Sequence, residues 1–322
     1  MKTLFRTLIG LSAACLCAAA SAASFPSKPV TLIVPFPAGG TTDILARDIG
    51  NELARLWNQP VIIDNKGGAS GTIGSANLTR SKADGYTLMV TATHHIINPT
   101  LLKASIPYDT KTAFTNLAML ATVPSVLVVN KNFPPQTVQE LIDLAKQKPG
   151  TINFGSAGIG GANHLAGELF AHMAGIELTH IPYRGAAPSL SDLLAGQIPM
   201  MFDSVPGVIA HINSGALRAL GVSSAQAIPQ LPDVPPIAQA GVPGFEAVAM
   251  FGLYGPAGLA PEVVGKIEQD MAKVLTSDTI RQRFEQLGAT PGTLSQAEFS
   301  TYVDQEIDKW QQVIESAGIS LE

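Results

Sequence analysis

From Val30 to Thr42 the chain reads Val-Thr-Leu-Ile-Val-Pro-Phe-Pro-Ala-Gly-Gly-Thr-Thr. An apolar run of strand character leads into a glycine-rich turn, and a helical pattern follows the turn. The first N–H groups of a helix have no partner within the helix and lie at the positive end of its dipole, so a glycine turn there can cradle an anion. The stretch therefore predicts a strand, an anion-binding turn and a helix.

A second stretch has the same form. From Thr151 to Gly161 the chain reads Thr-Ile-Asn-Phe-Gly-Ser-Ala-Gly-Ile-Gly-Gly. Either turn alone is equally well an ordinary strand-to-helix connection, in which glycine supplies a positive φ. The pair, with hydroxyl groups at Thr41, Thr42 and Ser156, favours a binding site with one turn in each of two domains facing a shared cleft.

The N-terminus predicts export. Lys2 and Arg6 precede an apolar run over residues 8–20, and the run ends in the small-residue cleavage pattern Ala20-Ser21-Ala22. This is the pattern of a secretory signal peptide, here residues 1–22, and the run is too short to span a bilayer. Both cysteines of the chain, Cys15 and Cys17, lie within it. The mature chain then has no thiol for catalysis or metal binding.

The charge balance is acidic. Removal of Lys2 and Arg6 leaves 18 Lys and Arg against 25 Asp and Glu, a net charge of −7. No basic stripe is present, so we expect no nucleic-acid partner. An acidic protein can still bind an anion. A negative side chain ~20 Å away through water repels a bound anion by only about 0.2 kcal/mol, whereas a helix N-terminus in contact with the anion stabilises it by about 0.3–2 kcal/mol.

Short apolar runs alternate with helical patterns along the mature chain, which favours an α/β fold of mainly parallel sheets flanked by helices. We expect Thr41 or Thr42 to cap the first helix. Two long extended runs, residues 117–130 with Pro124 and residues 247–254, are typical of strands that cross between domains. The predicted organisation is a signal peptide (1–22), a first domain (23–123 plus 246–322) and an inserted second domain (124–245).

Enzyme motifs are not found. The glycines at 155, 158, 160 and 161 do not form G-x-G-x-x-G, and the chain has no G-x-S-x-G, P-loop or H-E-x-x-H pattern. His94 and His95 have no further ligands at zinc spacing. We therefore predict no catalytic residue, no cofactor and no metal site.

Six motifs, in order from Phe25 to the C-terminus, carry a family resemblance. The chain resembles the Bug, or TctC-type, periplasmic solute receptors of tripartite tricarboxylate transporters in residues 25–35, 37–43, 65–71, 155–158 with 164–170, 182–188 and 201–203. The resemblance implies a two-domain periplasmic binding protein of type II topology, a Venus flytrap that closes on a small organic carboxylate. It also implies a periplasmic location, transporter membrane subunits as partners, and a monomer.

The family's ligand-binding positions can be carried onto this sequence. They are Phe36, Pro37, Ala38, Gly39, Gly40, Thr41 and Thr42 in the first turn, Ser156, Ala157 and Gly158 in the second, and Ser70, Thr91, His94, Arg184, Gly185 and Asp203 around them. Many relatives have one histidine or none where this chain has His94 and His95, and this difference weakens any ligand specificity carried over from the family.

Some of these residues have a second interpretation. Arg184 suits bidentate pairing with a carboxylate, but an arginine there could equally tie down a loop or pair with Asp203. Asp203 would repel a carboxylate yet could accept from an amine or hydroxyl, and it could also form a turn. His164 fits packing or capping better than ligand contact. His94 and His95 point to opposite faces if extended, so at most one lines the cleft.

Two alternative functions remain open at this point. One is a secreted α/β enzyme acting on a small carboxylate, and the other is a ligand-loaded sensor presented to a membrane kinase.

Overall fold

The computed structural model describes residues 25–316 except 103–104. The predicted signal peptide, with Cys15 and Cys17, lies outside the described residues. Among the helices that are described, none combines the length and the apolar character that a membrane span requires.

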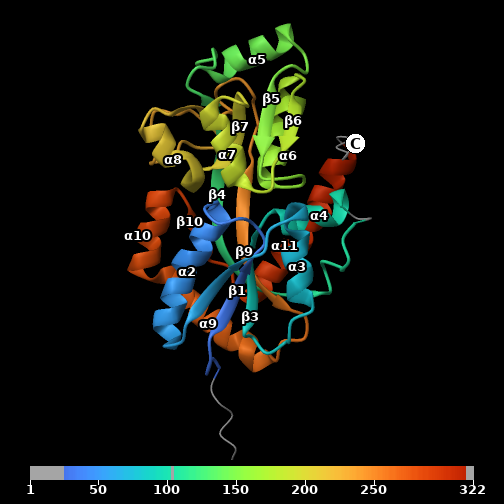
Figure 1. Cartoon of the computed structure of the whole chain (residues 1–322), viewed down its shortest axis with the longest axis vertical. Coiled ribbons are helices and arrows are strands. Elements are labelled where there is room, and N and C mark those ends of the chain that lie inside the picture. Colours follow the sequence, from blue (N-terminus) through green and yellow to red (C-terminus); the bar gives the residue numbers. More distant parts are fainter. Residues whose placement is uncertain (1–24, 103–104, 317–322) are drawn as a thin grey trace, which may run out of the picture.

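The strands form one mixed sheet in the order β2-β1-β3-β9-β4-β7-β5-β6, and β8 and β10 pair with β4 (Figure 1). The strands are β1 (Val30–Val34), β2 (Val61–Asn65), β3 (Thr87–Ala92), β4 (Phe114–Asn130), β5 (Asn153–Ser156), β6 (Thr179–Pro182), β7 (Met200–Ser204), β8 (Leu217–Val222), β9 (Val248–Pro256) and β10 (Thr290–Pro291). The helices are α2 (Thr41–Trp57), α3 (Thr72–Thr79), α4 (His94–Leu101), α5 (Val138–Gln147), α6 (Ala162–Ala174), α7 (Ala186–Ala195), α8 (Val205–Asn213), α9 (Pro261–Thr276), α10 (Asp278–Leu287) and α11 (Gln296–Ser316), with a 3₁₀ turn over Ala69–Gly71.

Two parallel groups, β2-β1-β3 and β7-β5-β6, lie on either side of β9 and β4. The two central strands are antiparallel to each other and to the groups that they join. The sequence indicated the parallel groups through their strand-turn-helix pattern. It gave no sign of strand direction for the two long apolar runs, because neighbouring strands of either direction share the same composition.

The chain divides into two lobes along β4. Residues 114–124 pair with β9, whereas residues 125–130 pair with β7 and β8. We call the part built on β1, β2, β3 and β9 lobe 1, and the part built on β5 to β8 lobe 2. The side chain of Ser223, at the end of β8, links the two connections: it accepts a hydrogen bond from Ser125 N (2.7 Å) and donates one to Ala247 O.

Each lobe has helices on both faces of its sheet. In β1, Val30, Leu32 and Val34 face a core shared with α2, α9 and α10, while Ile33 faces a core shared with α3, α4 and α11. Successive side chains of a strand point to opposite faces, so a strand buried on both sides is apolar throughout. In lobe 2, α5 and α6 cover one face and α7 and α8 the other.

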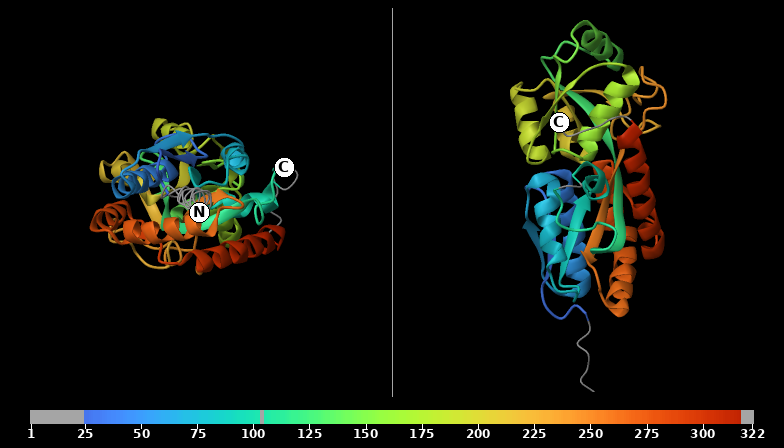
Figure 2. Two further views of the ribbon diagram at one scale, coloured as in Figure 1. Left: turned by 90° about the horizontal axis from the view of Figure 1, so that it is seen from below. Right: turned by 90° about the vertical axis from the view of Figure 1, so that its right-hand side faces the viewer.

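A small apolar cluster joins the lobes away from the central strands. Ile97 and Leu101 of α4 pack with Leu165 of α6 and Ile314 of α11. Figure 2 shows the same arrangement from the side, with α11 running along lobe 1 and ending beside lobe 2. The C-terminal helix therefore contacts both lobes.

Three local features differ from the expectations. Gly40, not Thr41 or Thr42, is the N-cap of α2, because the helix begins one residue earlier than a side-chain cap would place it. The segment after β3 is not a loop but the helix α4, and α8 follows β7 directly. Both helices are short and contain a proline (Pro99 and Pro206), and eight or nine residues are too few for a helical period to stand out in the sequence.

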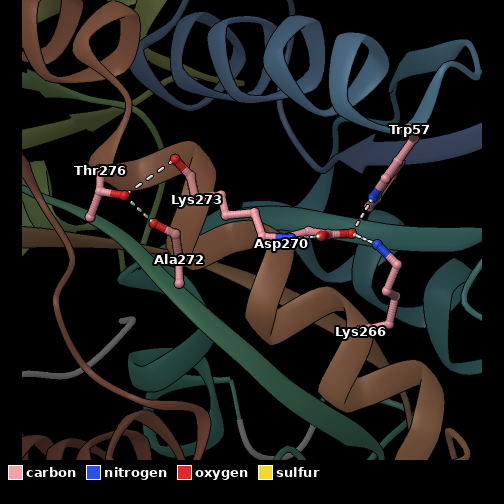
Figure 3. A network of polar contacts seen from close by, with 6 residues as sticks. All are labelled: Trp57, Lys266, Asp270, Ala272, Lys273 and Thr276. Atoms are coloured by element: carbon pink, nitrogen blue, oxygen red, sulfur yellow. Dashed lines mark hydrogen bonds and ion pairs between the residues drawn. The ribbon is translucent and has the colours of Figure 1, made fainter.

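A buried carboxylate fastens the end of α2 to α9. Asp270 has no exposed surface and accepts hydrogen bonds from Trp57 Nε1 (2.7 Å), Lys266 Nζ and Lys273 Nζ (3.3 Å; Figure 3). Burial acts to raise the pKa of Asp270, but the three donors outweigh burial and hold that pKa below its usual value. The carboxylate therefore stays ionised inside the protein.

Replacement of this carboxylate tests its contribution. We expect Asp270→Ala to lower the free energy of unfolding by about 1–3 kcal/mol at pH 7, because it leaves the buried Trp57 N–H without a partner. Asp308→Ala, which removes an exposed ion pair with Lys111, should cost about 1 kcal/mol or less. Because the pKa of Asp270 is lowered, its contribution is present above about pH 4 and is lost on further acidification. Urea denaturation at pH 7 and pH 3.5 measures both effects, and equal losses for the two variants would contradict the assignment.

Candidate ligand-binding site

A cavity of about 40 Å³ lies between the lobes, larger than the roughly 10–15 Å³ that one water molecule needs. Lobe 1 contributes Phe36, Pro37, Gly40, Thr41, Thr42, Ala92, His94, Ala249 and Phe251, and lobe 2 contributes Ala157, Ala162, Asn163, Ala186, Asp203 and Ser204. The two glycine turns thus meet at one cavity, as the paired sequence pattern predicts.

The N-termini of five helices reach this cavity. Thr41, His94, Ala162 and Ala186 are the first residues of α2, α4, α6 and α7, and Ser204 is the N-cap of α8. In none of the five does the N-cap side chain accept a hydrogen bond from its helix. Of the described residues that line the cavity, none is Lys or Arg. Backbone N–H groups and helix dipoles are therefore what an anion would meet here.

The first turn contributes only part of its residues to the cavity. Ala38 and Gly39 are not among the residues that line it. The N–H of Gly39 instead donates to Asp43 Oδ2 (3.0 Å), and Arg47 and Asn65 donate to the same carboxylate. Burial acts to raise the pKa of Asp43, but these donors hold it below its usual value. The turn is thus held in shape by a carboxylate at the start of its own helix.

The second turn is held from within in a similar way. Ser156 has no exposed surface, and its Oγ accepts a hydrogen bond from Gly158 N (3.1 Å) and lies 2.6 Å from His180 Nε2. Of the three predicted residues of this turn, only Ala157 lines the cavity. The serine hydroxyl therefore acts on the shape of the turn.

A neighbouring groove of about 200 Å³ holds Ser70, Gly158 and Arg184, and it shares Phe36 and Ala157 with the cavity. Arg184 is exposed and, in the part of the chain that is described, forms no ion pair with Asp203. Thr91 is buried within β3 and lines neither space.

The lobes touch across the cavity and the groove. A methyl group placed on Gly185 would lie 2.8 Å from Pro37 Cδ, and one on Gly158 would lie 3.2 Å from Ser70 Oγ. Such short separations show that the backbone of lobe 2 approaches lobe 1 where only glycine fits. Gly158 also has φ +127°, a conformation that other residues rarely adopt.

His94 and His95 have different surroundings because they lie on the first turn of α4. His94 lines the cavity beside the ring of Phe36, 4.7 Å between centroids. His95 lies in the lobe 1 core between Phe114 and Tyr254. The expectation that at most one of them lines the cleft holds, although the reason given for it, an extended backbone, is wrong. Burial and, to a lesser degree, the nearby His164 lower the pKa of His94 to about 3, so His94 is neutral at pH 7.

Asp203 is a buried carboxylate with one oxygen in use. Its Oδ1 accepts from Asn163 Nδ2 (2.9 Å) and from Ser204 N (2.8 Å), whereas its Oδ2 is buried without a partner. Thr41 Oγ1 and both ring nitrogens of His94 also have no partner. Burial raises the pKa of Asp203 to about 6, although the two donors partly oppose this. Several buried polar atoms around the cavity are thus available to a ligand.

The sequence did not identify seven of the lining residues: Ala92, Ala162, Asn163, Ala186, Ser204, Ala249 and Phe251. Ala162 with Asn163, and Ala186, come directly after the glycines that precede two helices, Gly161 and Gly185, which is a signal that could have found them. Ala249 and Phe251 lie on β9 and have no such signal. Among the described residues no group of three or more His, Cys, Asp or Glu side chains could hold a metal ion.

Gly161 of lobe 2 lies against His94 of lobe 1, and its replacement tests whether contact between the lobes matters for binding. The backbone of Gly161 (φ −81°, ψ 162°) accepts any side chain, but a methyl group on it would lie 2.2 Å from His94 Nε2 across the cavity. We expect Gly161→Ala to weaken ligand binding at least tenfold, about 1.4 kcal/mol. The control is Gly265→Ala on α9, where a methyl group meets nothing within 4 Å. Calorimetric titration compares them, and equal affinity in the two variants would contradict a role for the contact.

Comparison with known proteins identifies the family. A sequence profile described as the tripartite tricarboxylate transporter family receptor matches residues 45–319. A solved structure of an R. palustris protein with adipate is 37% identical, with a TM-score of 0.89 over 92% of this chain and 99% of that one. MatC from Rhodopseudomonas palustris with bound malate is 30% identical, with a TM-score of 0.85 over 90% and 100%.

A third structure differs more in overall shape. The solute-binding protein TctC from Polaromonas, solved with no ligand, is also 30% identical and covers 91% of this chain and 100% of its own, but its TM-score is 0.65. These matches extend over nearly the whole of each protein and confirm the resemblance seen in the sequence. The chain belongs to the tripartite tricarboxylate transporter receptors, a family of periplasmic solute-binding proteins and not of enzymes.

Proposed function

We propose that this protein binds a small dicarboxylate in the cavity between its lobes and delivers it to the membrane subunits of a tripartite transporter. The observation that carries the proposal is the convergence of five helix N-termini on a cavity that no described Lys or Arg side chain lines. Each N-terminus in contact with an anion contributes about 0.3–2 kcal/mol, and enclosure away from water favours the upper end.

Two further observations support a dicarboxylate. The relatives with adipate and with malate both hold dicarboxylates, and each covers at least 90% of this chain. The cavity is also polar at separate points, with Thr41 and His94 from lobe 1 and Asp203 from lobe 2. One carboxylate at the helix N-termini leaves the rest of the ligand to be recognised by these side chains.

Asp203 places a condition on that second part of the ligand. When ionised, its free Oδ2 accepts hydrogen bonds only, so it matches a hydroxyl group, an ammonium group or a bridging water and repels a bare carboxylate. The hydroxyl of Thr41 lies near this oxygen, because both atoms are close to Gly207. A methyl group placed on Gly207 would lie 2.9 Å from Asp203 Oδ2 and 3.4 Å from Thr41 Oγ1. Ligands that differ by one hydroxyl group should therefore differ in affinity.

A ligand screen tests the proposal. We expect a dicarboxylate from C4 to C6 to bind one-to-one with a dissociation constant near or below 1 μM, about −8 kcal/mol. A hundredfold excess over the dissociation constant then adds about 2.7 kcal/mol of apparent stability. Thermal shifts with succinate, malate, aspartate, glutarate and adipate measure this, with the Gly161→Ala variant as the control. Mass spectrometry of ligand released from denatured, freshly purified protein provides an independent measurement.

The absence of both a thermal shift and a co-purified carboxylate would contradict the proposal. A shift of equal size in the Gly161→Ala variant would show that the carboxylate binds without need of the contact between Gly161 and His94.

We further propose that lobe 1 and lobe 2 are domains that move as rigid bodies about the two connections near Ser125 and Ala247. MatC with malate and the Polaromonas protein without ligand have equal identity to this chain, yet their TM-scores are 0.85 and 0.65. The TM-score is calculated over the whole chain, so it falls when two rigid parts change their placement relative to each other, even if each part keeps its own structure. The two connections are single strands, which can absorb small changes in φ and ψ.

Small-angle X-ray scattering tests the motion. We expect the radius of gyration to fall when the dicarboxylate found in the screen is added, because closure requires contacts from both lobes. The Gly161→Ala variant should show a smaller fall at the same occupancy. An identical scattering curve with and without saturating ligand would indicate a rigid cleft.

A further inference from the structure

Two histidines of lobe 2 hold the second glycine turn. His164, on the first turn of α6, accepts a hydrogen bond through Nδ1 from Gly160 N (3.2 Å). His180, on β6, lies with its Nε2 2.6 Å from the Oγ of Ser156, which in turn accepts from Gly158 N. The two imidazole rings stack at 4.0 Å between centroids. Both ends of the turn are thus tied to one histidine pair.

The bond to Gly160 requires one protonation state of His164. A backbone N–H can donate to Nδ1 only while that nitrogen has a free lone pair, so the proton of the neutral ring lies on Nε2. Nε2 in turn faces Glu168 Oε1 at 3.5 Å. A second proton on the ring would occupy Nδ1 and replace the hydrogen bond with two N–H groups that face each other. The turn can keep its shape only while His164 is neutral.

The groups around His164 can be named element by element. His94 of α4 lies on the other side of the turn against Gly161, His180 of β6 stacks on the ring, and Glu168 lies on α6 itself. Burial and, to a lesser degree, the proximity of His164 lower the pKa of His94 and of His180 to about 3. Both neighbouring imidazoles are therefore uncharged near neutral pH, and Glu168 is the carboxylate that faces the ring of His164.

The turn that these groups hold is part of the proposed ligand site. Ala157 lines the cavity, as do Ala162 and Asn163 at the start of α6. Asn163 also donates to Asp203 Oδ1, so displacement of the turn would disturb the polar side of the cavity. His164 itself is 4% exposed and is not among the lining residues. It can affect a ligand only through the turn.

We propose that His164 is a positioning residue that makes ligand affinity depend on pH: the neutral ring holds the second turn in its binding shape, and protonation of the ring releases the turn and the ligand. The proposal rests on the proposed function for its effect on affinity, but the change in the turn does not need a ligand. One experiment can therefore test the two parts separately.

The ligand-free part uses NMR of ¹⁵N-labelled full chain between pH 8 and pH 5. We expect His164 to be the tautomer with the proton on Nε2 at pH 8, and the Gly160 amide signal to shift as His164 takes up its second proton. His164→Asn retains an acceptor oxygen near the position of Nδ1 but does not titrate, so its Gly160 amide should not follow pH. A proton on Nδ1 at pH 8, or a Gly160 signal in wild type that ignores the titration of His164, would overturn the proposal.

The binding part measures the dissociation constants of malate and adipate at pH 7.5 and pH 5.5. Uptake of one proton on release lets the affinity fall by up to tenfold for each unit by which the pH is lowered. We expect this loss in wild type and in His172→Asn, where an exposed histidine of the same helix is changed. His164→Asn should bind with little pH dependence, and His164→Leu weakly at both pH values.

Asp203 and the ligand's own carboxyl groups are present in all four proteins, so a pH dependence that these groups alone cause appears in all four. An equal loss in wild type and His164→Asn would overturn the proposal. If neither probe binds any of the proteins, the proposed dicarboxylate function fails, and the NMR result alone decides whether His164 controls the turn.

Discussion

The unpaired N–H groups at the start of a helix are the constraint on which this structure depends. Such groups must find a partner or water, and five helices begin at the same cavity between the lobes. Lobe 1 supplies α2 and α4, and lobe 2 supplies α6, α7 and α8. In the proposed site, charge recognition therefore comes from the backbone, which does not change with side-chain substitution. This leaves the lining side chains free to determine which anion is bound.

The central antiparallel strands make this convergence possible. In a parallel strand-helix unit, each helix begins at the carboxyl end of the preceding strand. The two parallel groups lie on opposite sides of β9 and β4, so the carboxyl ends of β1 and β3 face those of β5 and β7 across the cleft. Because Ser223 bonds to both connections, the strands that link the lobes are joined at a single buried hydroxyl group.

The sequence predicted most of the frame and about half of the cavity. The strand and the helix predicted on either side of the first glycine turn are β1 and α2, and the division of residues 114–130 between two sets of partners agrees with a crossing strand near Pro124. Glycine turns can be recognised because their residues have a local role. Ala249 and Phe251 could not be recognised, because they lie within β9 and have the apolar side chains that any buried strand contains. Gly39 and Ser156 were predicted to bind the ligand, but the N–H of Gly39 bonds to Asp43 and the hydroxyl of Ser156 bonds to His180.

The two buried titratable groups on the cavity wall respond to pH in opposite directions. The pKa of His94 is lowered, so the stability that its neutral form gives to the folded protein is present above pH 6.5 and is lost as the pH falls. The pKa of Asp203 is raised to about 6, so its contribution is present below pH 4 and is lost as the pH rises through 6. Near neutral pH the wall thus presents an uncharged imidazole from lobe 1 and a mostly ionised carboxylate from lobe 2. Since no described cation lines the cavity, a negative ligand must keep its charge at the helix N-termini and turn its hydrogen-bond donors towards Asp203.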